Sequence, residues 1–183
     1  MAITGASGSI YARSLLRNIV PHYETVYVIV SDTASIIMRD ELGTDDVRKV
    51  VGMAEKLTVL DNTDMSAPPS SGSHQYDGMV VVPCSMGAVG RIAAGVSQDL
   101  ISRVADVCLK ERRRLVLVPR ETPLSAIHLE NLLKLSRAGA VVLPASPPFY
   151  NKPQTIDDLV NAVTARILSH LGIEQDLVKE WKE

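Results

Sequence analysis

The sequence is poor in cysteine, in aromatic residues and in long apolar runs, and these shortages exclude several classes of protein. It has two cysteines, Cys84 and Cys108, which are too few for a disulfide framework and which lie in apolar runs, as reduced cytosolic thiols do. Its longest apolar stretches have the length of strands, well below the roughly 20 residues that cross a bilayer. No signal peptide is evident. We therefore expect no membrane association and a cytoplasmic location.

Charge of one sign is also lacking. The 19 basic and 21 acidic side chains give a net charge of -2, which supplies no long-range attraction for nucleic acid or anionic membranes. Small molecules are therefore the expected partners, with no nucleic acid. A chain of 183 residues can bury a core without disulfides or metals, so we expect a single domain over residues 1–183.

Short β-branched runs alternate with helical patterns along the chain, as in α/β proteins. Four runs are apolar on both faces, as strands between two helical layers must be: residues 24–32, 77–85, 113–121 and 138–146. A helix is predicted from Thr155 to Leu171, because Thr155 and Asp158 match a capping box and Gly172 suits the end. About five or six βα units predict a three-layer, doubly wound, Rossmann- or flavodoxin-like domain with a parallel sheet.

Two segments depart from this regular pattern. The opening MAITGASGS leaves about three or four residues for the first strand, where five or six is usual, which makes a shortened N-terminus plausible. Residues 64–74 are rich in proline, serine and glycine and lie between closely spaced strands. This is the composition of an ordered loop, which could cover a site.

Small and hydroxyl residues follow three of the predicted strands. They are Gly5, Ala6, Ser7 and Gly8, then Ser31, then Ser85, Met86, Gly87 and Ala88. The ends of adjacent parallel strands meet at one edge, where hydroxyls and free helix N-terminal amides could hold a flat heterocycle and its phosphate. A tight turn without a ligand is the alternative for the first group. The chain has no G-x-G-x-x-G pattern, and Asp32 alone is weak evidence for a nicotinamide nucleotide.

Charged side chains stand at a strand end and at the margins of apolar helix stripes. They are Arg120 and Glu121 after a buried strand, Arg103 and Lys110 on the helix over residues 100–110, and Arg166 on the last helix. Partly buried cations need an anion, although snorkelling or ordinary surface pairs explain each one equally well. Tyr150, in a proline-rich loop, could offer a phenol to an anion or merely staple the loop.

A thiol nucleophile and a metal site are not favoured. Cys84 lies at a strand end, but no histidine stands in a supporting position and buried thiols are usually inert. His128 and His170 fall on predicted helices without ligand spacing, so no metal is expected.

Four longer motifs carry a resemblance to a known family. The segments TGASGSIY, PCSMGAVGRIAAG, ADVCLKERRRLVLVPRETPLSAIHLENLLKLS and PPFYNKPQTIDDLV resemble the flavin prenyltransferases of UbiX type, formerly described as aromatic acid decarboxylases. The resemblance covers nearly the whole chain. It implies a flavoprotein that joins a dimethylallyl group, from dimethylallyl phosphate, to N5 and C6 of reduced FMN. The prenylated flavin would pass to a partner decarboxylase, and the enzyme would be a homo-dodecamer that needs no metal.

The resemblance also implies roles for individual residues. The implied flavin contacts are Gly5, Ala6, Ser7, Ser31, Ser85, Met86, Gly87, Ala88, Arg103 and Arg120. The implied contacts to the phosphate of the prenyl donor are Lys110, Arg120, Tyr150 and Arg166. Proton transfer would fall to Glu121 and Glu41, with Ser7 near N5 of the flavin.

One position departs from the family. Related members carry a Trp before the Ala-Pro-Pro of the 64–74 loop, where this chain has Met65, and Trp181 lies far away in the tail. An aromatic face would stabilise an allyl cation by about 0.5 to 2 kcal/mol, and a thioether by less. The donor is either the monophosphate or the diphosphate. Two alternatives stay open: an FMN-dependent cysteine decarboxylase-like flavoprotein, and a flavin-binding subunit without catalysis.

Overall fold

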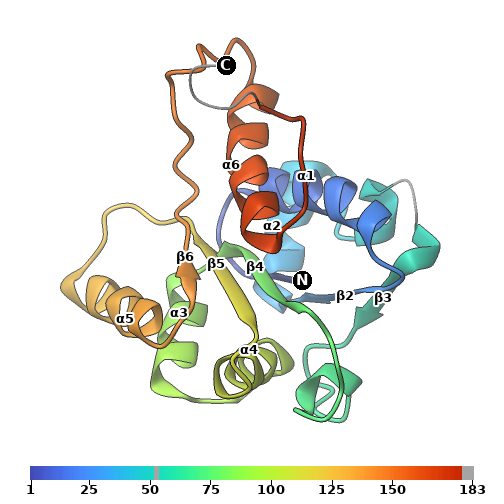
Figure 1. Ribbon diagram of the computed structural model, residues 1–183, viewed down its shortest axis with the longest axis vertical. Helices are drawn as coiled ribbons and strands as arrows, with labels where there is room; N and C mark the ends of the chain where they lie inside the picture. Colours follow the sequence, from blue (N-terminus) through green and yellow to red (C-terminus); the bar gives the residue numbers. More distant parts are fainter. Residues whose placement is uncertain (52–53, 179–183) are drawn as a thin grey trace.

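A parallel sheet of six strands forms the centre of the computed structural model, which describes residues 1–51 and 54–178 (Figure 1). The strands are β1 (Ala2–Ile3), β2 (Val26–Val30), β3 (Leu57–Leu60), β4 (Gly78–Cys84), β5 (Arg114–Pro119) and β6 (Val141–Val142). Their order is β3-β2-β1-β4-β5-β6. The chain moves outward from β1 to β3, returns to β4 beside β1, and moves outward to β6. This doubly wound topology confirms the predicted fold class.

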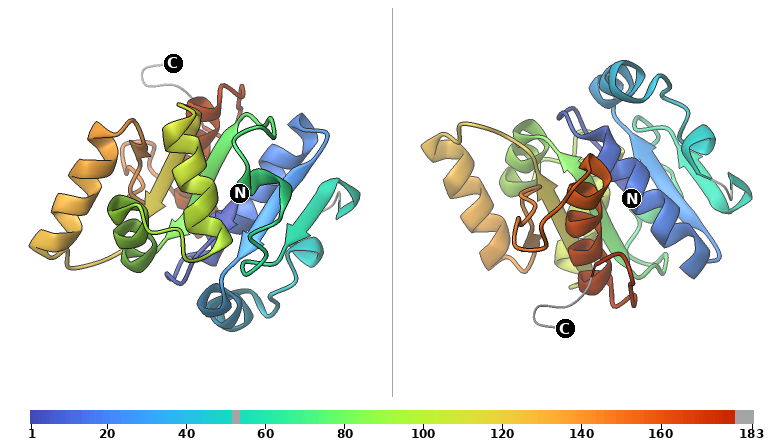
Figure 2. Two further views of the ribbon diagram at one scale, coloured as in Figure 1. Left: turned by 90° about the horizontal axis from the view of Figure 1, so that it is seen from below. Right: turned by 90° about the horizontal axis from the view of Figure 1, so that it is seen from above.

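Helices cover both faces of the sheet. One face carries α1 (Ser9–Ile19), α2 (Asp32–Leu42) and α6 (Ile156–Leu171), and the other carries α3 (Met86–Ala94), α4 (Leu100–Lys110) and α5 (Ala126–Arg137). Figure 2 shows α3 and α4 across one face and α1 and α6 across the other. Short 3-10 helices lie in the connections: η1 (Val20–His22), η2 (Val47–Val50), η3 (Ala54–Lys56) and η4 (Pro68–Ser70). In the described part of the chain, no helix is long and apolar enough to cross a membrane.

The central strands are apolar on both faces because each face packs into its own core. In β4, Val81 packs with the α3 and α4 face, whereas Val80 and Val82 pack with the α1 and α6 face. All three are at most 4% exposed. Side chains alternate along a strand, so a strand between two helical layers needs apolar residues at every position. This is why such strands read as continuous apolar runs.

The last helix has the ends that its sequence predicts. The Thr155 hydroxyl accepts a hydrogen bond from the Asp158 amide at 3.1 Å, and the Asp158 carboxylate accepts one from the Thr155 amide at 2.9 Å. Gly172 ends the helix with a φ of 76°, in the left-handed region that favours glycine. The capping box and the glycine stop are both confirmed.

Three strands differ from their predicted extent. The first strand, β1, has two residues rather than three or four, and the run at residues 138–146 contains only Val141 and Val142 as regular strand. Hydrogen bonding to β5 continues beyond Val142, because the Leu143 amide donates to the Leu117 carbonyl at 2.8 Å. The edge strand β3 was not among the predicted runs, because its Thr58 and Val59 are exposed and the alternation is lost.

The segment that follows β3 lies along α4 instead of forming a crossover helix. The Leu100 amide, at the start of α4, donates to the Asn62 carbonyl at 2.8 Å. One turn further, Arg103 donates from Nε to the Ser70 carbonyl at 3.0 Å. These contacts order the proline- and serine-rich segment, in agreement with its composition.

Residues 143–155 form an arm between β6 and α6. In Figure 1 the arm and the first turns of α6 extend beyond the rest of the two layers. The exposed fractions are 72% for Phe149, 53% for Tyr150 and 70% for Ile156. The arm therefore presents large side chains away from the sheet.

Candidate functional site

The candidate site lies at the carboxyl ends of β1, β2, β4 and β5. The winding direction reverses between β1 and β4, and ligands of such sheets bind in the crevice at this switch point. The predicted turns follow these strands directly: residues 4–8 after β1, Ser31 after β2, residues 85–88 after β4, and Arg120 and Glu121 after β5. The topology therefore brings the predicted turns to one edge of the sheet.

A buried threonine joins the turns after β1 and β4. Thr4, which is 2% exposed, donates its hydroxyl to the Pro83 carbonyl at 2.9 Å and accepts from the Ser85 amide at 2.7 Å. Sequence reasoning missed Thr4, although a hydroxyl between a strand and a glycine turn was a usable signal. Thr4 fixes the two sides of the switch point to each other.

Replacing Thr4 with Val should lower the free energy of unfolding by about 1 to 3 kcal/mol. The change leaves the Ser85 amide without its partner and removes one of the two donors to the buried Pro83 carbonyl, which keeps the Thr4 amide at 3.2 Å, while the side-chain volume is retained. Equilibrium urea unfolding measures the effect. Thr4→Ser retains the hydroxyl and serves as the matched control, with a smaller expected loss. Equal losses in the two variants would contradict a hydrogen-bonding role.

Glu41, from the last turn of α2, caps the N-terminus of α1. Its carboxylate accepts hydrogen bonds from the Gly8 amide at 3.0 Å and from the Ser9 amide at 2.7 Å. The expectation that this helix offers free amides to a phosphate or a ring edge is therefore wrong for these two groups. A carboxylate from a neighbouring helix already occupies the positive end of α1.

Hydrogen bonds keep Glu41 charged. Burial is the largest single influence and would raise its pKa, but the Ser7 hydroxyl, the Ser9 and Gly8 amides and the Ser9 hydroxyl together lower the pKa below its ordinary range. The Ser7 hydroxyl thus faces a carboxylate, which holds it as a donor. This interaction joins two of the three residues predicted to handle protons.

The variant Glu41→Gln should be less stable than the wild type at neutral pH, and the difference should shrink in acid. A carboxylate with a lowered pKa in the folded state contributes stability above its unfolded pKa of about 4.3, and this contribution is lost as the pH falls through the folded value. Urea midpoints of both proteins, measured from neutral pH to about pH 3, should converge below about pH 4.3. A gap that stays constant over this range would contradict the assignment.

Arg120 links the end of β5 to the turn after β1. Its Nε donates to the Ser7 carbonyl at 2.9 Å, and its amide donates to the Cys84 carbonyl at 3.3 Å. Burial raises the pKa of Tyr11, in the first turn of α1, and the positive charge of Arg120 partly opposes this rise. The guanidinium therefore places a cation at the switch point, beside Ser7.

The next residue, Glu121, points its carboxylate to an exposed position. One carboxylate oxygen accepts from the amide of Thr122 at 3.0 Å. Arg120 therefore connects two turns through its hydrogen bonds, whereas the neighbouring Glu121 carboxylate is exposed and accessible to a ligand.

Ser31 and Ser85 begin helices rather than offering free hydroxyls. Each accepts from the amide three residues ahead, Ala34 at 3.2 Å and Ala88 at 3.3 Å, as N-cap residues do. In the turn after β4, Met86 and Ala88 are buried, whereas Gly87 is exposed. A ligand at this turn would therefore meet the backbone around Gly87.

Cys84 is unsuited to nucleophilic catalysis. Its thiol is fully buried, and burial raises its pKa to about 12, with only partial opposition from Arg91. A thiol with this pKa stays protonated at neutral pH, which supports its interpretation as a core residue. Within residues 1–51 and 54–178, no three His, Cys, Asp or Glu side chains gather in a way that could hold a metal ion.

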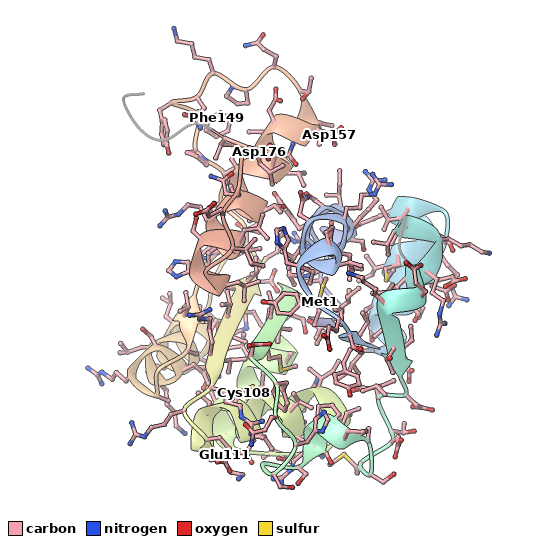
Figure 3. All side chains as sticks on the ribbon, turned by 45° about the vertical axis from the view of Figure 1, so that its right-hand side comes forward. Met1, Cys108, Glu111, Phe149, Asp157 and Asp176 are labelled. Atoms are coloured by element: carbon pink, nitrogen blue, oxygen red, sulfur yellow. The ribbon has the colours of Figure 1, made fainter. Side chains whose placement is uncertain are left out.

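The residues predicted to clamp a phosphate do not come together within one chain. Lys110 pairs with Glu111 at the end of α4, while Tyr150 lies on the arm. Figure 3 places Glu111 and Phe149, their sequence neighbours, at opposite ends of the molecule. One chain alone therefore does not bring Lys110 and Tyr150 to a common phosphate.

Two further arginines lie on helices rather than in the turns after the strands. Arg103 already has two partners, the Ser70 carbonyl and the Asp106 carboxylate, the latter at 3.2 Å. Arg166 stands on the exposed side of α6. Helical periodicity places a residue around the helix axis but does not show which residues of other elements it meets.

Comparison with known proteins places this arrangement in a family. The family model described as Flavoprotein matches residues 1–168. The flavin prenyltransferase UbiX of Pseudomonas aeruginosa is 46% identical over 194 residues, which cover 100% of this chain and 93% of the relative. This chain belongs to the flavin prenyltransferase family of flavoproteins. The family resemblance read from the four sequence motifs is thereby confirmed.

Two solved structures of the family share the fold over the whole chain. AnUbiX (PadA1), in complex with FMN and dimethylallyl pyrophosphate, is 42% identical with a TM-score of 0.91, and the match covers 100% of this chain and 95% of that one. The dodecameric FMN-dependent UbiX-like decarboxylase of Escherichia coli O157:H7 is 40% identical with a TM-score of 0.88, over 100% of both chains.

Proposed function

We propose that this protein is a flavin prenyltransferase, which joins a dimethylallyl group to N5 and C6 of reduced FMN. The observation that carries the proposal is the Arg120 and Glu121 pair at the switch point, with Arg120 bonded to the turn that bears Ser7. The family supports it, because the related AnUbiX structure contains both FMN and a dimethylallyl donor.

The strand ends fit a flavin mononucleotide. A flat ring needs small residues and approachable backbone, which Ser7 and Gly87 provide as exposed positions on either side of the switch point. Arg120 supplies a positive charge for an anionic group. The proposed flavin contacts are Gly5, Ala6, Ser7, Ser31, Ser85, Met86, Gly87, Ala88, Arg103 and Arg120.

The remaining residues would stabilise charge and move protons. Bound reduced FMN supplies the nucleophile for the allyl carbon. Breaking the allylic C–O bond leaves negative charge on the phosphate, which fixed donors stabilise: Lys110, Arg120, Tyr150 and Arg166. Glu121 would take up the proton that the joining reaction releases. Glu41, held in its charged form, would keep the Ser7 hydroxyl oriented.

We further propose that the phosphate clamp forms between copies in a homo-dodecamer. Glu111 and Phe149, the sequence neighbours of Lys110 and Tyr150, lie at opposite ends of one chain (Figure 3), so a second copy would have to bring Lys110 and Tyr150 together. The related Escherichia coli protein is dodecameric. Exposed apolar side chains on α5 and on the arm supply contact surface: Ile127 at 69%, Leu129 at 54%, Leu133 at 50% and Phe149 at 72%. Light scattering should give the mass of twelve 19.8 kDa chains.

The donor, the location and the recipient complete the proposal. We assign dimethylallyl phosphate as donor, a metal-independent reaction, a single domain, and a decarboxylase as recipient of the product. The two free, buried cysteines support a cytoplasmic location.

Met65 is 42% exposed where the family has Trp, so prenyl transfer should be slower or less selective than with an aromatic residue. Trp181 lies outside the described residues.

Anaerobic incubation with reduced FMN and each candidate donor tests the function. Mass spectrometry should show a flavin heavier by one dimethylallyl unit, with the monophosphate as the better donor. An unchanged flavin would overturn the proposal. Carbon dioxide released from candidate acids with FMN alone would favour a cysteine decarboxylase-like activity, and FMN binding without either reaction would favour a flavin-binding subunit.

A further inference from the structure

Lys110, which the proposed function assigns to the donor phosphate, already has an anionic partner in the chain. Its Nζ donates to the carboxylate of Glu111, the residue that caps the end of α4. The side chains of the two residues are 46% and 38% exposed. Figure 3 shows Glu111 at the periphery of the molecule. The pair therefore stands at the surface, with the ammonium partly open to an incoming anion.

The Glu111 carboxylate is charged at neutral pH. The hydrogen bond from Lys110 lowers its pKa most, the positive charge of Lys110 lowers the pKa further, and the charge of Arg113 adds a smaller effect in the same direction. A phosphate that reached Lys110 would bring a second negative charge to the same ammonium. Because like charges repel at short range, the phosphate and the Glu111 carboxylate compete for Lys110.

Backbone closes the inner side of the pair. Gly72, in the segment that lies along α4, has no room for a side chain, because a Cβ atom there would stand 2.9 Å from the Lys110 Nζ and closer still to the Glu111 carboxylate. Arg113 fixes this backbone: its Nη2 donates to the Gly72 carbonyl at 2.6 Å and its Nη1 to the His74 carbonyl at 2.8 Å. The pair cannot move inward, so an anion must approach Lys110 from the exposed side.

We propose that Glu111 is a positioning residue for donor binding, which acts through Lys110. It holds the ammonium in place while the site is empty and yields it to the phosphate when the donor binds. This exchange of one anion for another offsets part of the attraction between Lys110 and the phosphate. Glu111 therefore lowers the affinity for the donor and for the inorganic phosphate that the reaction releases. The inference rests on the proposed function, in which Lys110 contacts that phosphate.

Replacing Glu111 with Gln tests the exchange. The amide keeps the size of the side chain and an oxygen that can accept from Lys110, but it lacks the competing charge. With reduced FMN and the intact oligomer, the KM for dimethylallyl phosphate should fall about two- to fivefold, the range of exposed ion pairs, with kcat within about twofold of the wild type. Structural damage would raise the KM instead. Glu24→Gln, at an exposed acid outside the site, should leave the KM unchanged.

A second substitution shows whether the effect passes through Lys110. Lys110→Met should raise the KM, and adding Glu111→Gln to it should cause no fall, because no ammonium is left to compete for. The proposal is overturned by a KM for Glu111→Gln equal to or above that of the wild type, or by an equal fall in the Lys110→Met background. An unchanged KM in Lys110→Met also overturns it, while continued prenylation by that variant leaves the proposed function standing.

Calorimetric titration of inorganic phosphate into the FMN-loaded protein gives the same comparison without turnover. Glu111→Gln should bind phosphate about two- to fivefold more tightly than the wild type, and Lys110→Met should bind it more weakly. Equal affinities of Glu111→Gln and the wild type would contradict the exchange. The titration needs no prenyl donor, so its outcome is independent of prenyl transfer.

Discussion

Replacing Arg120 with Met should lower the rate of flavin prenylation by about 10²- to 10³-fold, the usual loss when one donor to a developing negative charge is removed. The change also cuts the 2.9 Å hydrogen bond from Nε to the Ser7 carbonyl, so the turn that faces the flavin loses its tie to β5. Rates of prenylated flavin formation, measured by mass spectrometry under anaerobic conditions with saturating FMN, give the effect.

Two variants separate the charge of Arg120 from its shape. Arg120→Lys keeps the positive charge but lacks the planar fork and the Nε donor, so we expect an intermediate rate. Lys49→Met removes an exposed cation on η2 that has no place in the site and should leave the rate unchanged. An Arg120→Met rate within about tenfold of the wild type would contradict the assignment.

The central strands could be predicted because two cores enclose them. Val80, Val81 and Val82 are all buried, so the sequence of β4 has no polar side to interrupt its apolar run. At the edge of the sheet this signal fails. Thr58 and Val59 of β3 face solvent, and β6 has a partner on one side only, so local sequence carries little information about where these strands begin and end.

The predicted parallel sheet correctly placed the residues after the strands at one edge of the sheet, but it did not predict the hydrogen bonds between those turns. Ser7, Ser31, Ser85 and Arg120 each end or follow a parallel strand, and such ends must share one edge. Glu41 reaches amides that lie 33 and 32 residues earlier in the chain, and Thr4 reaches Ser85 across 81 residues. These contacts depend on how helices and turns dock, which no local pattern records.

Replacing Glu121 with Gln should lower product formation by about 10²- to 10⁴-fold while FMN binds as in the wild type. The amide keeps the size of the side chain, and its oxygen can still accept from the Thr122 amide, which is 3.0 Å from the carboxylate. What it loses is the ability to take up a proton. FMN affinity from fluorescence quenching, measured beside the rate of prenylation, separates binding from chemistry.

The dependence on donor concentration then distinguishes Glu121 from Arg120. A carboxylate does not attract the phosphate of the donor, so Glu121→Gln should lower kcat with little change in the KM for dimethylallyl phosphate. Loss of the Arg120 cation removes attraction to the donor phosphate in the bound and reacting states alike, so Arg120→Met should raise KM as well as lower kcat. Glu24→Gln, at an exposed acid far in sequence from both residues, controls for the loss of one negative charge. Unchanged prenylation by Glu121→Gln with FMN bound would move the proton-transfer role to another residue.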